Sequence, residues 1–321
     1  MIIVTGASGF IGSCLVSFLN KKGIEDLILV DEFNREDKLA NIEGKKYIEK
    51  VNRDLFDTWL KDNASSIDIV FHYGARTDTT EFNESVFEEL NLGYSKMVWN
   101  HCSEFKIPLI YASSAATYGG GEFGYNDDDD SVFKLKPLNP YGRSKHDFDI
   151  WALDQEKKPP FWAGLKFFNI YGPNEYHKGR MASVVYHAFN QIKDSKQLKL
   201  FRSHNPKYKD GMQLRDFCYI KDLLEVSCFF MNNRKQSGLY NLGSGQARAF
   251  IDLGRQVFKS MHITENIKFI DTPLDIRDKY QYYTEANIAK LRKAGFKASF
   301  TSLEDGVDEY VSGFLKKEKY F

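Results

Sequence analysis

The sequence predicts an α/β protein, with a doubly wound parallel sheet followed by a smaller α/β C-terminal lobe. Short apolar strands alternate with helical stretches through the first half of the chain, and this rhythm requires crossover connections that cover both faces of a parallel sheet. The first apolar run leads straight into Gly6, Gly9 and Gly12, a spacing that suits the turn from a strand into a nucleotide-binding helix. Together these observations predict a Rossmann fold.

The strands expected in the first half lie at 2–4, 27–30, 67–72, 108–113 and 163–168, with a weak third strand that begins at 47–48. Between them, residues at helical spacing predict helices from residue 10 to just before Gly23, across 84–105, and from Tyr141 to about residue 155. Gly23 is expected to end the first helix.

The second half mixes short strands at 198–201, 217–220 and 239–242 with helices near 181–194, 221–233, 285–294 and 302–316. We therefore divide the chain into a dinucleotide-binding domain, 1–170, and a substrate-binding lobe, 171–321, interleaved with the last strands of the sheet. The acidic run Asp127 to Asp130 is interpreted as a solvated loop.

Composition excludes several classes of partner. Lysine plus arginine and aspartate plus glutamate both number 44, so the formal net charge is zero, which argues against nucleic acid or an anionic membrane as a bulk partner. The four cysteines include no C-x-x-C pair and no metal-ligand spacing, so we expect reduced thiols and no metal site. No apolar run approaches the length of a membrane helix. With the first strand starting at residue 2, we also expect no signal peptide and a cytoplasmic location.

The glycine-rich turn predicts a dinucleotide site. The first glycine permits the tight turn, the second lets backbone amides approach the pyrophosphate, and the third lets the helix pack on the strand. Asp31 ends the second strand, where its carboxylate can accept both hydroxyls of an adenosine ribose, which favours NAD. Lys38 and Arg53 could instead neutralise the 2′-phosphate of NADP, so both cofactors stay open on these charges. Asp54 is either an adenine ligand or a plain loop acid.

A second set of residues predicts redox chemistry. Ser114 ends the fifth strand, at the edge of the sheet where ligands of such folds bind. Tyr141 and Lys145 are four residues apart, on one face of a helix. A free phenol is a poor base near neutral pH, and we expect the Lys145 ammonium and an oxidised nicotinamide to lower its pKa. Tyr141 could then remove a hydroxyl proton while Ser114 holds the same oxygen.

Four stretches together resemble the extended short-chain dehydrogenases/reductases, most of which act on nucleotide sugars. They are the opening 6–12, the run Tyr111-Ala-Ser-Ser-Ala-Ala-Thr-Tyr-Gly119, the Tyr141 to Lys145 motif, and Phe168-Asn-Ile-Tyr-Gly-Pro173. Within that family, the run 114–120, the loop His177-Lys-Gly-Arg-Met-Ala-Ser183 and Tyr280-Gln281 are most similar to the epimerases of an ADP-heptose. The similarity covers nearly the whole chain, with apparent insertions near 121–135 and 206–213.

The resemblance implies tightly bound NADP and epimerisation at C6″ of ADP-D-glycero-D-manno-heptose. The hydroxyl is oxidised to a ketone and reduced again from the opposite face, and the L-glycero product serves the inner core of lipopolysaccharide. Two acid–base groups are required, because the oxygen is approached from different sides in the two halves. Tyr141 is one of these groups, and Lys178 matches the position of the second acid–base group in the family. The alternative is that Lys178 is a surface lysine or a lysine that contacts a phosphate. A homo-oligomer such as a pentamer is also implied.

Motif and resemblance together define two sets of site residues. The predicted cofactor site comprises Gly6, Gly9, Phe10, Ile11, Gly12, Asp31, Glu32, Lys38, Arg53, Tyr73, Gly74, Ala75, Arg76, Thr77, Asn91, Lys145 and Lys178. The predicted substrate site comprises Ser114, Asn169, Ile170, Arg180, His187, Phe201, Arg202, Ser203, His204, Arg215 and Tyr280. Arg215 suits the diphosphate because its planar fork can bind phosphate oxygens in pairs, whereas His187 could equally be structural. Glu32 carries a charge that opposes a 2′-phosphate.

Three other functions are compared with this one. A 4,6-dehydratase needs an acid and a base beside the serine, usually Asp-Glu, and this chain has Ala115-Ala116 there. A UDP-sugar 4-epimerase also reuses one tyrosine and a bound cofactor, and the 177–179 loop favours the heptose enzyme over it. A non-catalytic protein that senses a dinucleotide could dispense with Tyr141 and Lys145.

Overall fold

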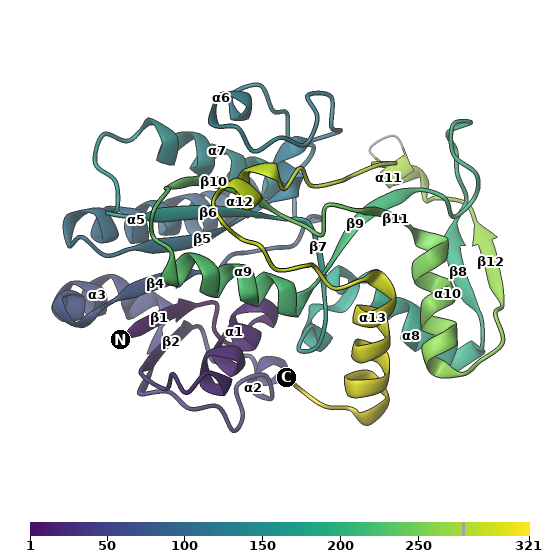
Figure 1. Cartoon of the computed structure of the whole chain (residues 1–321), viewed down its shortest axis with the longest axis horizontal. Helices are drawn as coiled ribbons and strands as arrows, with labels where there is room; N and C mark the ends of the chain where they lie inside the picture. Colours follow the sequence, from purple (N-terminus) through teal and green to yellow (C-terminus); the bar gives the residue numbers. More distant parts are fainter. Residues whose placement is uncertain (278–279) are drawn as a thin grey trace.

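A seven-stranded parallel sheet forms the centre of the protein. The computed structural model describes residues 1–277 and 280–321, and its main sheet has the order β10-β6-β5-β4-β1-β2-β3 (Figure 1). The strands are β1 (Ile2–Thr5), β2 (Leu27–Asp31), β3 (Glu49–Asn52), β4 (Ile69–His72), β5 (Leu109–Ser114), β6 (Trp162–Phe167) and β10 (Gly238–Leu242). All neighbouring pairs run parallel. The predicted fold class is confirmed.

Helices cover both faces of this sheet. They include α1 (Phe10–Lys21) and α9 (Ile220–Asn232) on one face, and α3 (Phe56–Asn63), α5 (Tyr94–Glu104) and α7 (Pro140–Asp154) on the other. Because side chains alternate along a strand, β1 contributes to two separate cores. Val4 packs in the core that contains α1 and α9, and Ile3 packs in the core that contains Val98 and Trp99 of α5. The strand order reverses between β1 and β4, and ligands of such sheets bind beyond the carboxyl ends of the strands at that point.

A smaller lobe holds two further sheets. One joins β7 (Asn169–Tyr171), β9 (Leu214–Tyr219) and β11 (Ala247–Ala249), and the other pairs β8 (Leu198–Phe201) with β12 (Ile267–Ile270). The β8–β12 sheet lies at the right of the view in Figure 1, next to α8 (Val184–Ser195) and α10 (Phe250–Met261). The strand β10 crosses back from this half and pairs with β6. The boundary between 1–170 and 171–321 stays a prediction.

Several shorter elements complete the chain. They are α2 (Glu36–Leu39), α4 (Glu84–Phe87), α6 (Asp129–Val132), α11 (Leu274–Arg277), α12 (Ala289–Lys293) and α13 (Leu303–Asp308). The single helix expected across 84–105 consists of α4, a π-helical segment (Glu88–Gly93) and α5. The helix expected across 302–316 is similarly interrupted, by a π-helical segment at Glu309–Phe314. The helix expected across 285–294 is shorter, because α12 begins only at Ala289.

One sequence prediction is wrong and one boundary is shifted. The third strand, expected to begin at 47–48, runs over Glu49–Asn52 on the edge of the sheet, where only Val51 is buried; such a strand needs little apolar sequence. The acidic run is not simply solvated. Asp127 is buried and accepts a hydrogen bond from the Asn241 amide at 2.7 Å, while Asp129 begins α6 and pairs with Lys290 at 2.9 Å.

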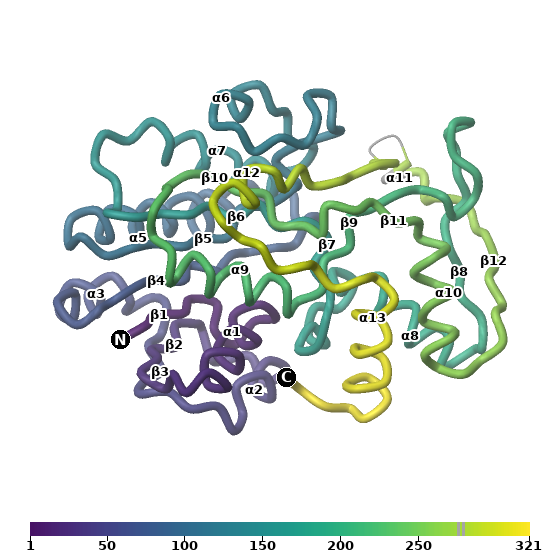
Figure 2. Tube along the Cα trace, viewed as in Figure 1, coloured from purple at the N-terminus to yellow at the C-terminus, as the bar shows by residue number. Residues whose placement is uncertain are grey.

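The C-terminal end of the chain packs against α1. The trace in Figure 2 returns from α13 toward α1 and α2, where Ser17 of α1 donates a hydrogen bond to the Phe321 oxygen at 2.7 Å. No helix among residues 1–277 and 280–321 has both the length and the apolar character needed to cross a membrane. Within the same residues, no group of histidine, cysteine or acidic side chains is arranged to hold a metal ion.

A buried ion pair joins the elements that carry the predicted catalytic residues. The Lys166 ammonium on β6 lies 2.5 Å from the Asp149 carboxylate on α7, and both side chains are fully buried. The same carboxylate accepts hydrogen bonds from the Tyr111 hydroxyl at 3.1 Å and the Ser113 hydroxyl at 2.6 Å, both on β5. One carboxylate therefore fixes α7 against two neighbouring strands.

We predict that Asp149→Asn lowers the free energy of unfolding by about 3–5 kcal/mol, because it leaves the Lys166 charge buried without a counterion. Chemical denaturation of both proteins measures the difference. Glu84→Gln is the control: it breaks the Arg143–Glu84 pair, which is exposed on the surface, and should cost less than about 1 kcal/mol. Equal losses in the two variants would contradict the prediction.

Candidate active site

The glycine-rich turn leaves backbone room for a phosphate. Gly6 has a positive φ of 66°, and a Cβ built on it would lie 2.7 Å from the Cα of Gly74. A Cβ on Gly12 would collide with the Gly6 carbonyl. The helix α1 begins at Phe10, and its N-cap Gly9 offers no side-chain acceptor, so the first amides of the helix face outward for an anion. These features fit a dinucleotide pyrophosphate.

Four charged residues gather at the carboxyl end of β2. The Asp31 carboxylate accepts hydrogen bonds from the amides of Ser8 at 3.0 Å and Glu32 at 2.8 Å. Lys38 lies 3.7 Å from Asp31, and Arg53 lies 3.5 Å from Glu32. The two acids and the two bases thus pair with each other. Asp54 lies in a short 3-10 turn and is exposed.

The segment after β4 passes close beside the glycine-rich turn. The Gly74 amide donates to the Thr5 hydroxyl at 3.0 Å, whereas the Tyr73 side chain points away and bonds to Ser227 of α9 at 2.7 Å. Tyr73 can therefore contact a cofactor only through its backbone. Ala75 is half-buried and Thr77 is exposed. The Arg76 amide donates to the Asn91 oxygen at 2.8 Å.

Asn91 lies in the π-helical segment between α4 and α5. Its amide nitrogen donates to the Arg76 carbonyl at 3.0 Å and to the Ser144 hydroxyl at 2.9 Å. A π-bulge often marks a functional position in a helix. Here it turns a buried amide toward both the cofactor loop and α7, so Asn91 has a positioning role in the structure.

Ser114, Tyr141 and Lys145 meet at the carboxyl end of β5. Asn139 caps α7 by accepting from the Gly142 amide at 2.7 Å, and Pro140 occupies the first turn, which places Tyr141 at the start of the helix. The Ser114 hydroxyl accepts the Ala116 amide at 3.1 Å, and it lies close enough to the Tyr141 phenol to affect its pKa. The Lys145 ammonium is buried and donates to the Ala112 carbonyl at 2.8 Å.

Burial determines the ionisation of Tyr141 in the protein alone. It raises the pKa of Tyr141, and the neighbouring Ser114 side chain only partly offsets the shift. The lowering was expected with an oxidised nicotinamide bound as well as with Lys145 nearby, so it stays a prediction for the cofactor-bound protein. Burial also lowers the pKa of Lys145 to about 8, against an opposing effect of the Asp149 charge.

Lys178 lies on the cofactor side of a loop between β7 and α8. It belongs to a 3-10 segment (Tyr176–Met181) with a left-handed Gly179. The ammonium lies 5.4 Å from the centre of the Phe10 ring at the start of α1. Burial lowers the pKa of Lys178, and the Glu175 carboxylate opposes this effect. Ile11, next to Phe10, packs partly buried against the core.

Arg215 is a buried guanidinium among aromatic rings. It lies 5.6 Å from the Phe250 ring and 5.5 Å from the Tyr280 ring, and it donates to the carbonyls of Leu214 and Gln281. Burial lowers its pKa, and its influential neighbours among the described residues are tyrosines rather than carboxylates. Such a cation can gain a great deal from an anionic ligand such as a diphosphate.

The other predicted substrate residues lie around this arginine and the Lys178 loop, and several of them already contact other residues of the protein. Phe201 packs edge-on against Tyr280 at 6.3 Å. Arg202 faces Asp210 at 3.6 Å, and His204 accepts from the Thr272 amide at 3.2 Å. Ser203 donates its hydroxyl to Asn205.

Of the remaining residues, Asn169 and Arg180 are exposed and Ile170 is half-buried. A His187 ring nitrogen lies 3.4 Å from the Arg180 carbonyl. The neighbouring loop 75–80 touches the Lys178 loop, since the Thr79 hydroxyl donates to the Met181 sulfur at 3.4 Å.

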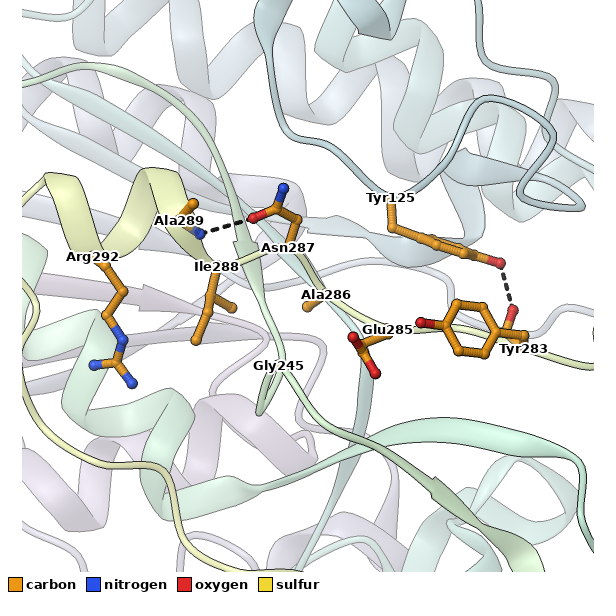
Figure 3. Close-up of a pocket in the computed structure, with 9 residues that line it drawn as sticks. All are labelled: Tyr125, Gly245, Tyr283, Glu285, Ala286, Asn287, Ile288, Ala289 and Arg292. Atoms are coloured by element: carbon orange, nitrogen blue, oxygen red, sulfur yellow. Dashed lines mark hydrogen bonds between the residues drawn. The ribbon is translucent and has the colours of Figure 1, made fainter.

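A separate cavity of about 570 Å³ lies between Tyr125 and Arg292 (Figure 3). None of the predicted site residues lines it. Its polar groups are already engaged: the Tyr125 hydroxyl donates to the Tyr283 carbonyl at 2.5 Å, and Arg292 donates to the carbonyls of Phe296 and Ala298. The Glu285 carboxylate accepts the Ala247 amide at 2.9 Å, and the candidate site remains the carboxyl edge of the main sheet, where the motif residues lie.

Sequence reasoning missed two buried polar residues at this edge. Glu175 is fully buried and bonds to both ends of the loop that carries Lys178. Asn41, 1% exposed, contacts Ser8 of the glycine-rich turn and His177. No periodicity or motif marks either residue, because their roles depend on contacts that are distant in the sequence.

The lowered pKa of Lys145 predicts a pH-dependent stability. Its folded pKa of about 8 lies below the ordinary 10.5, so the unfolded chain binds more protons between these values and stability rises with pH there. Relative to Lys145→Met, the free energy of unfolding of the wild type should rise by up to about 3 kcal/mol from pH 8 to 10.5. Denaturation at several pH values measures this difference, and parallel curves would count against the burial argument.

Comparison with known proteins shows the family of this chain. Residues 2–243 match the NAD dependent epimerase/dehydratase family. An ADP-L-glycero-D-manno-heptose-6-epimerase of Fusobacterium nucleatum is 48% identical, with 99% of each chain covered. One from Nitratidesulfovibrio vulgaris is 47% identical, with 98% of each covered. The crystal structure of the Helicobacter pylori enzyme of that name superposes with a TM-score of 0.81 at 27% identity, over 97% of this chain and 95% of the other. The chain therefore belongs to the NAD-dependent epimerase/dehydratase family, with heptose epimerases as full-length relatives.

Proposed function

We propose that this protein interconverts ADP-D-glycero-D-manno-heptose and ADP-L-glycero-D-manno-heptose by epimerisation at C6″. The names of its full-length relatives support the substrate. One arrangement carries the chemistry: two ionisable groups lie beyond the carboxyl ends of the parallel strands, one after β5 and the other beside the start of α1. Tyr141 lies beside Ser114 at the end of β5, and Lys178 lies over Phe10 at the start of α1. An epimerase that handles one oxygen from two sides needs such a pair.

The cofactor is a nicotinamide dinucleotide, as in the rest of the family. The cradle formed by Gly6 and Gly12 and the uncapped start of α1 fit its pyrophosphate. When bound, it supplies the reversible two-electron acceptor that oxidation and reduction at C6″ require. Its positive charge in the oxidised form also favours the Tyr141 phenolate, which burial otherwise disfavours.

In one half of the reaction, Tyr141 exchanges a proton with the C6″ oxygen, and the Ser114 hydroxyl holds that oxygen in place. The 6″-ketone then turns in the site, and reduction from the opposite face produces the other epimer. Lys178 exchanges the proton in this second geometry. Burial lowers the pKa of Lys178, and this increases the fraction of neutral amine near neutral pH.

Arg215 and the rings around it form the proposed site for the ADP group. Among the described residues, the acceptors of this buried guanidinium are backbone carbonyls, and its other N–H groups can bind diphosphate oxygens. Tyr280 and Phe201 provide aromatic faces beside it, suited to stacking. Asn169, Ile170, Arg180, His187 and 202–204 belong to the same proposal.

We also propose that the dinucleotide is NADP, with Lys38 and Arg53 as the cations for its 2′-phosphate. Both lie at the carboxyl end of β2, but each already faces a carboxylate. The phosphate therefore has to draw Arg53 away from Glu32. NAD is the alternative, since Asp31 can accept ribose hydroxyls.

The competing functions differ in what they convert. A 4,6-dehydratase is disfavoured because Ala115 and Ala116 form a 3-10 turn next to Ser114 and supply no acid or base. In the deciding experiment, the purified protein is incubated with ADP-D-glycero-D-manno-heptose and the C6″ signals are followed by NMR. Conversion of UDP-galactose in place of the heptose would support a 4-epimerase. Cofactor binding without any turnover would support a sensor. Homo-oligomerisation and the role in the lipopolysaccharide inner core stay predictions.

Tyr141→Phe should retain bound cofactor but reduce kcat by about a hundredfold or more, because only the phenol oxygen is lost. KM should change little. The loss is measured by the same NMR assay, together with the mass of cofactor released from the denatured variant. Tyr240→Phe is a matched control: it removes the same atom from a hydroxyl that bonds to Gln236, away from the site. Substantial turnover by Tyr141→Phe would refute the assignment.

Glu32→Gln should raise the preference for NADP over NAD by about threefold to tenfold, because it releases Arg53 from a competing partner. Titration of cofactor-free protein with each dinucleotide gives the ratio of Kd values. Glu36→Gln removes the same charge from an exposed position on α2 and should leave the ratio close to that of the wild type. An unchanged ratio in Glu32→Gln would mean that Arg53 does not contact the phosphate.

A further inference from the structure

The loop that carries Lys178 has little regular structure of its own. It runs from Gly172, just after β7, to Ser183, the N-cap of α8. Within it, the 3-10 segment is broken at Gly179, where φ is 53°. An irregular loop holds a side chain in one position only when other groups fix its backbone. Two buried side chains, Glu175 and Asn41, fix the backbone of this loop.

Glu175 ties the end of this loop to its beginning. Its carboxylate accepts the Ser183 amide at 2.5 Å and the Ser183 hydroxyl at 2.6 Å. It also lies 3.4 Å from the Gly172 amide, which donates to it. The side chain is fully buried. Three donors thus converge on one residue, and a carboxylate is the side chain with enough acceptor sites for them.

A second buried side chain docks the closed loop on the cofactor turn. The Asn41 amide nitrogen lies 2.9 Å from the Ser8 carbonyl in the glycine-rich turn. It also lies 3.2 Å from both the Asn174 carbonyl and a ring nitrogen of His177. Further along α1, Ser13 accepts from the Asn174 side chain at 2.9 Å. The loop is therefore fixed to the start of α1, where Lys178 faces Phe10.

We propose that Glu175 is the positioning residue for Lys178: it closes the loop 172–183 and thereby holds the lysine ammonium beside the cofactor turn. The catalytic consequence rests on the proposed function, whereas the closure of the loop does not. Removal of the carboxylate leaves the donors of Ser183 and Gly172 without an acceptor. The loop then opens, and Lys178 leaves its position while Tyr141, on α7, keeps its own.

This predicts a one-sided defect. Tyr141 serves one epimer and Lys178 the other, so a displaced Lys178 slows oxidation of only one of the two. A general loss of stability would slow both epimers alike. Glu175→Gln should therefore resemble Lys178→Met in which epimer it affects.

The experiment uses single-turnover reduction of the bound cofactor by each epimer, together with amide hydrogen exchange of residues 176–181. In Glu175→Gln, reduction by one epimer should slow by about tenfold or more, with the other within about twofold of the wild type. The affected epimer should be the one affected in Lys178→Met. Exchange across 176–181 should become faster in Glu175→Gln.

Asp222→Asn is the matched control. Asp222 is also a buried carboxylate, and it accepts the Thr301 amide at 3.0 Å and the Thr301 hydroxyl at 2.8 Å, the same pair of donors at a distant position. This variant should leave exchange of 176–181 unchanged and should not distinguish the epimers. If Glu175→Gln does not fold, Ser183→Ala removes one donor to the same carboxylate and should produce a weaker form of the one-sided defect.

Two results would overturn the proposal: equal slowing with both epimers in Glu175→Gln, or unchanged exchange of 176–181. Failure of the proposed function is distinguishable from either. In that case the wild type reduces its cofactor with neither epimer, while hydrogen exchange still decides whether Glu175 closes the loop.

Discussion

The ion pair between Asp149 and Lys166 is the constraint on which the site depends. Asp149 lies four residues beyond Lys145 on α7 and eight beyond Tyr141, so the three side chains share one face of the helix. Because its carboxylate also binds Ser113 and Tyr111 on β5, that face is fixed against the strand that ends in Ser114. Burying two charges is costly, and the structure offsets the cost with three further hydrogen bonds to the pair, from Tyr111, Ser113 and Thr117. The relative placement of Ser114 and Tyr141 follows from this arrangement.

Buried carboxylates also fix the backbone where it leaves regular helices and strands. Asp216 accepts the amides of Ser244, Gly245 and Ala286, and so holds the turn after β10 against the segment near 286. Glu175 does this for the Lys178 loop, and Asp127 for Asn241. Burial raises the pKa of all three carboxyl groups, and hydrogen bonds to each oppose the shift. In these segments, backbone amides have no hydrogen-bond partner in a helix or sheet, and buried carboxylates accept them instead. This stabilises the fold because leaving a buried amide without an acceptor costs free energy.

Prediction from sequence succeeded where the signal is local. The glycine spacing predicts the turn between β1 and α1, and the strand–helix rhythm predicts the parallel sheet; both are confirmed. It placed the start of β3 slightly early, since an edge strand with one buried residue leaves almost no apolar pattern. It failed for Asp127, because composition cannot separate a solvated acid from one that a distant amide binds. The raised pKa of Tyr141 in the protein alone was not predicted for a related reason: proximity along a helix does not reveal how deeply the phenol is buried.

By itself, the sequence determined the fold class and the spacing of Tyr141 and Lys145 on one helix face. These depend on helical and strand periods, which neighbouring residues express directly. Only the tertiary structure decided that Lys178 faces Phe10, that Arg215 lies between Phe250 and Tyr280, and that Glu175 and Asn41 hold the loop in between. These contacts join residues far apart in the chain. They form only when the free energy gained by burial in a common core exceeds the conformational entropy lost in closing long loops. No local sequence pattern indicates the difference between these two terms.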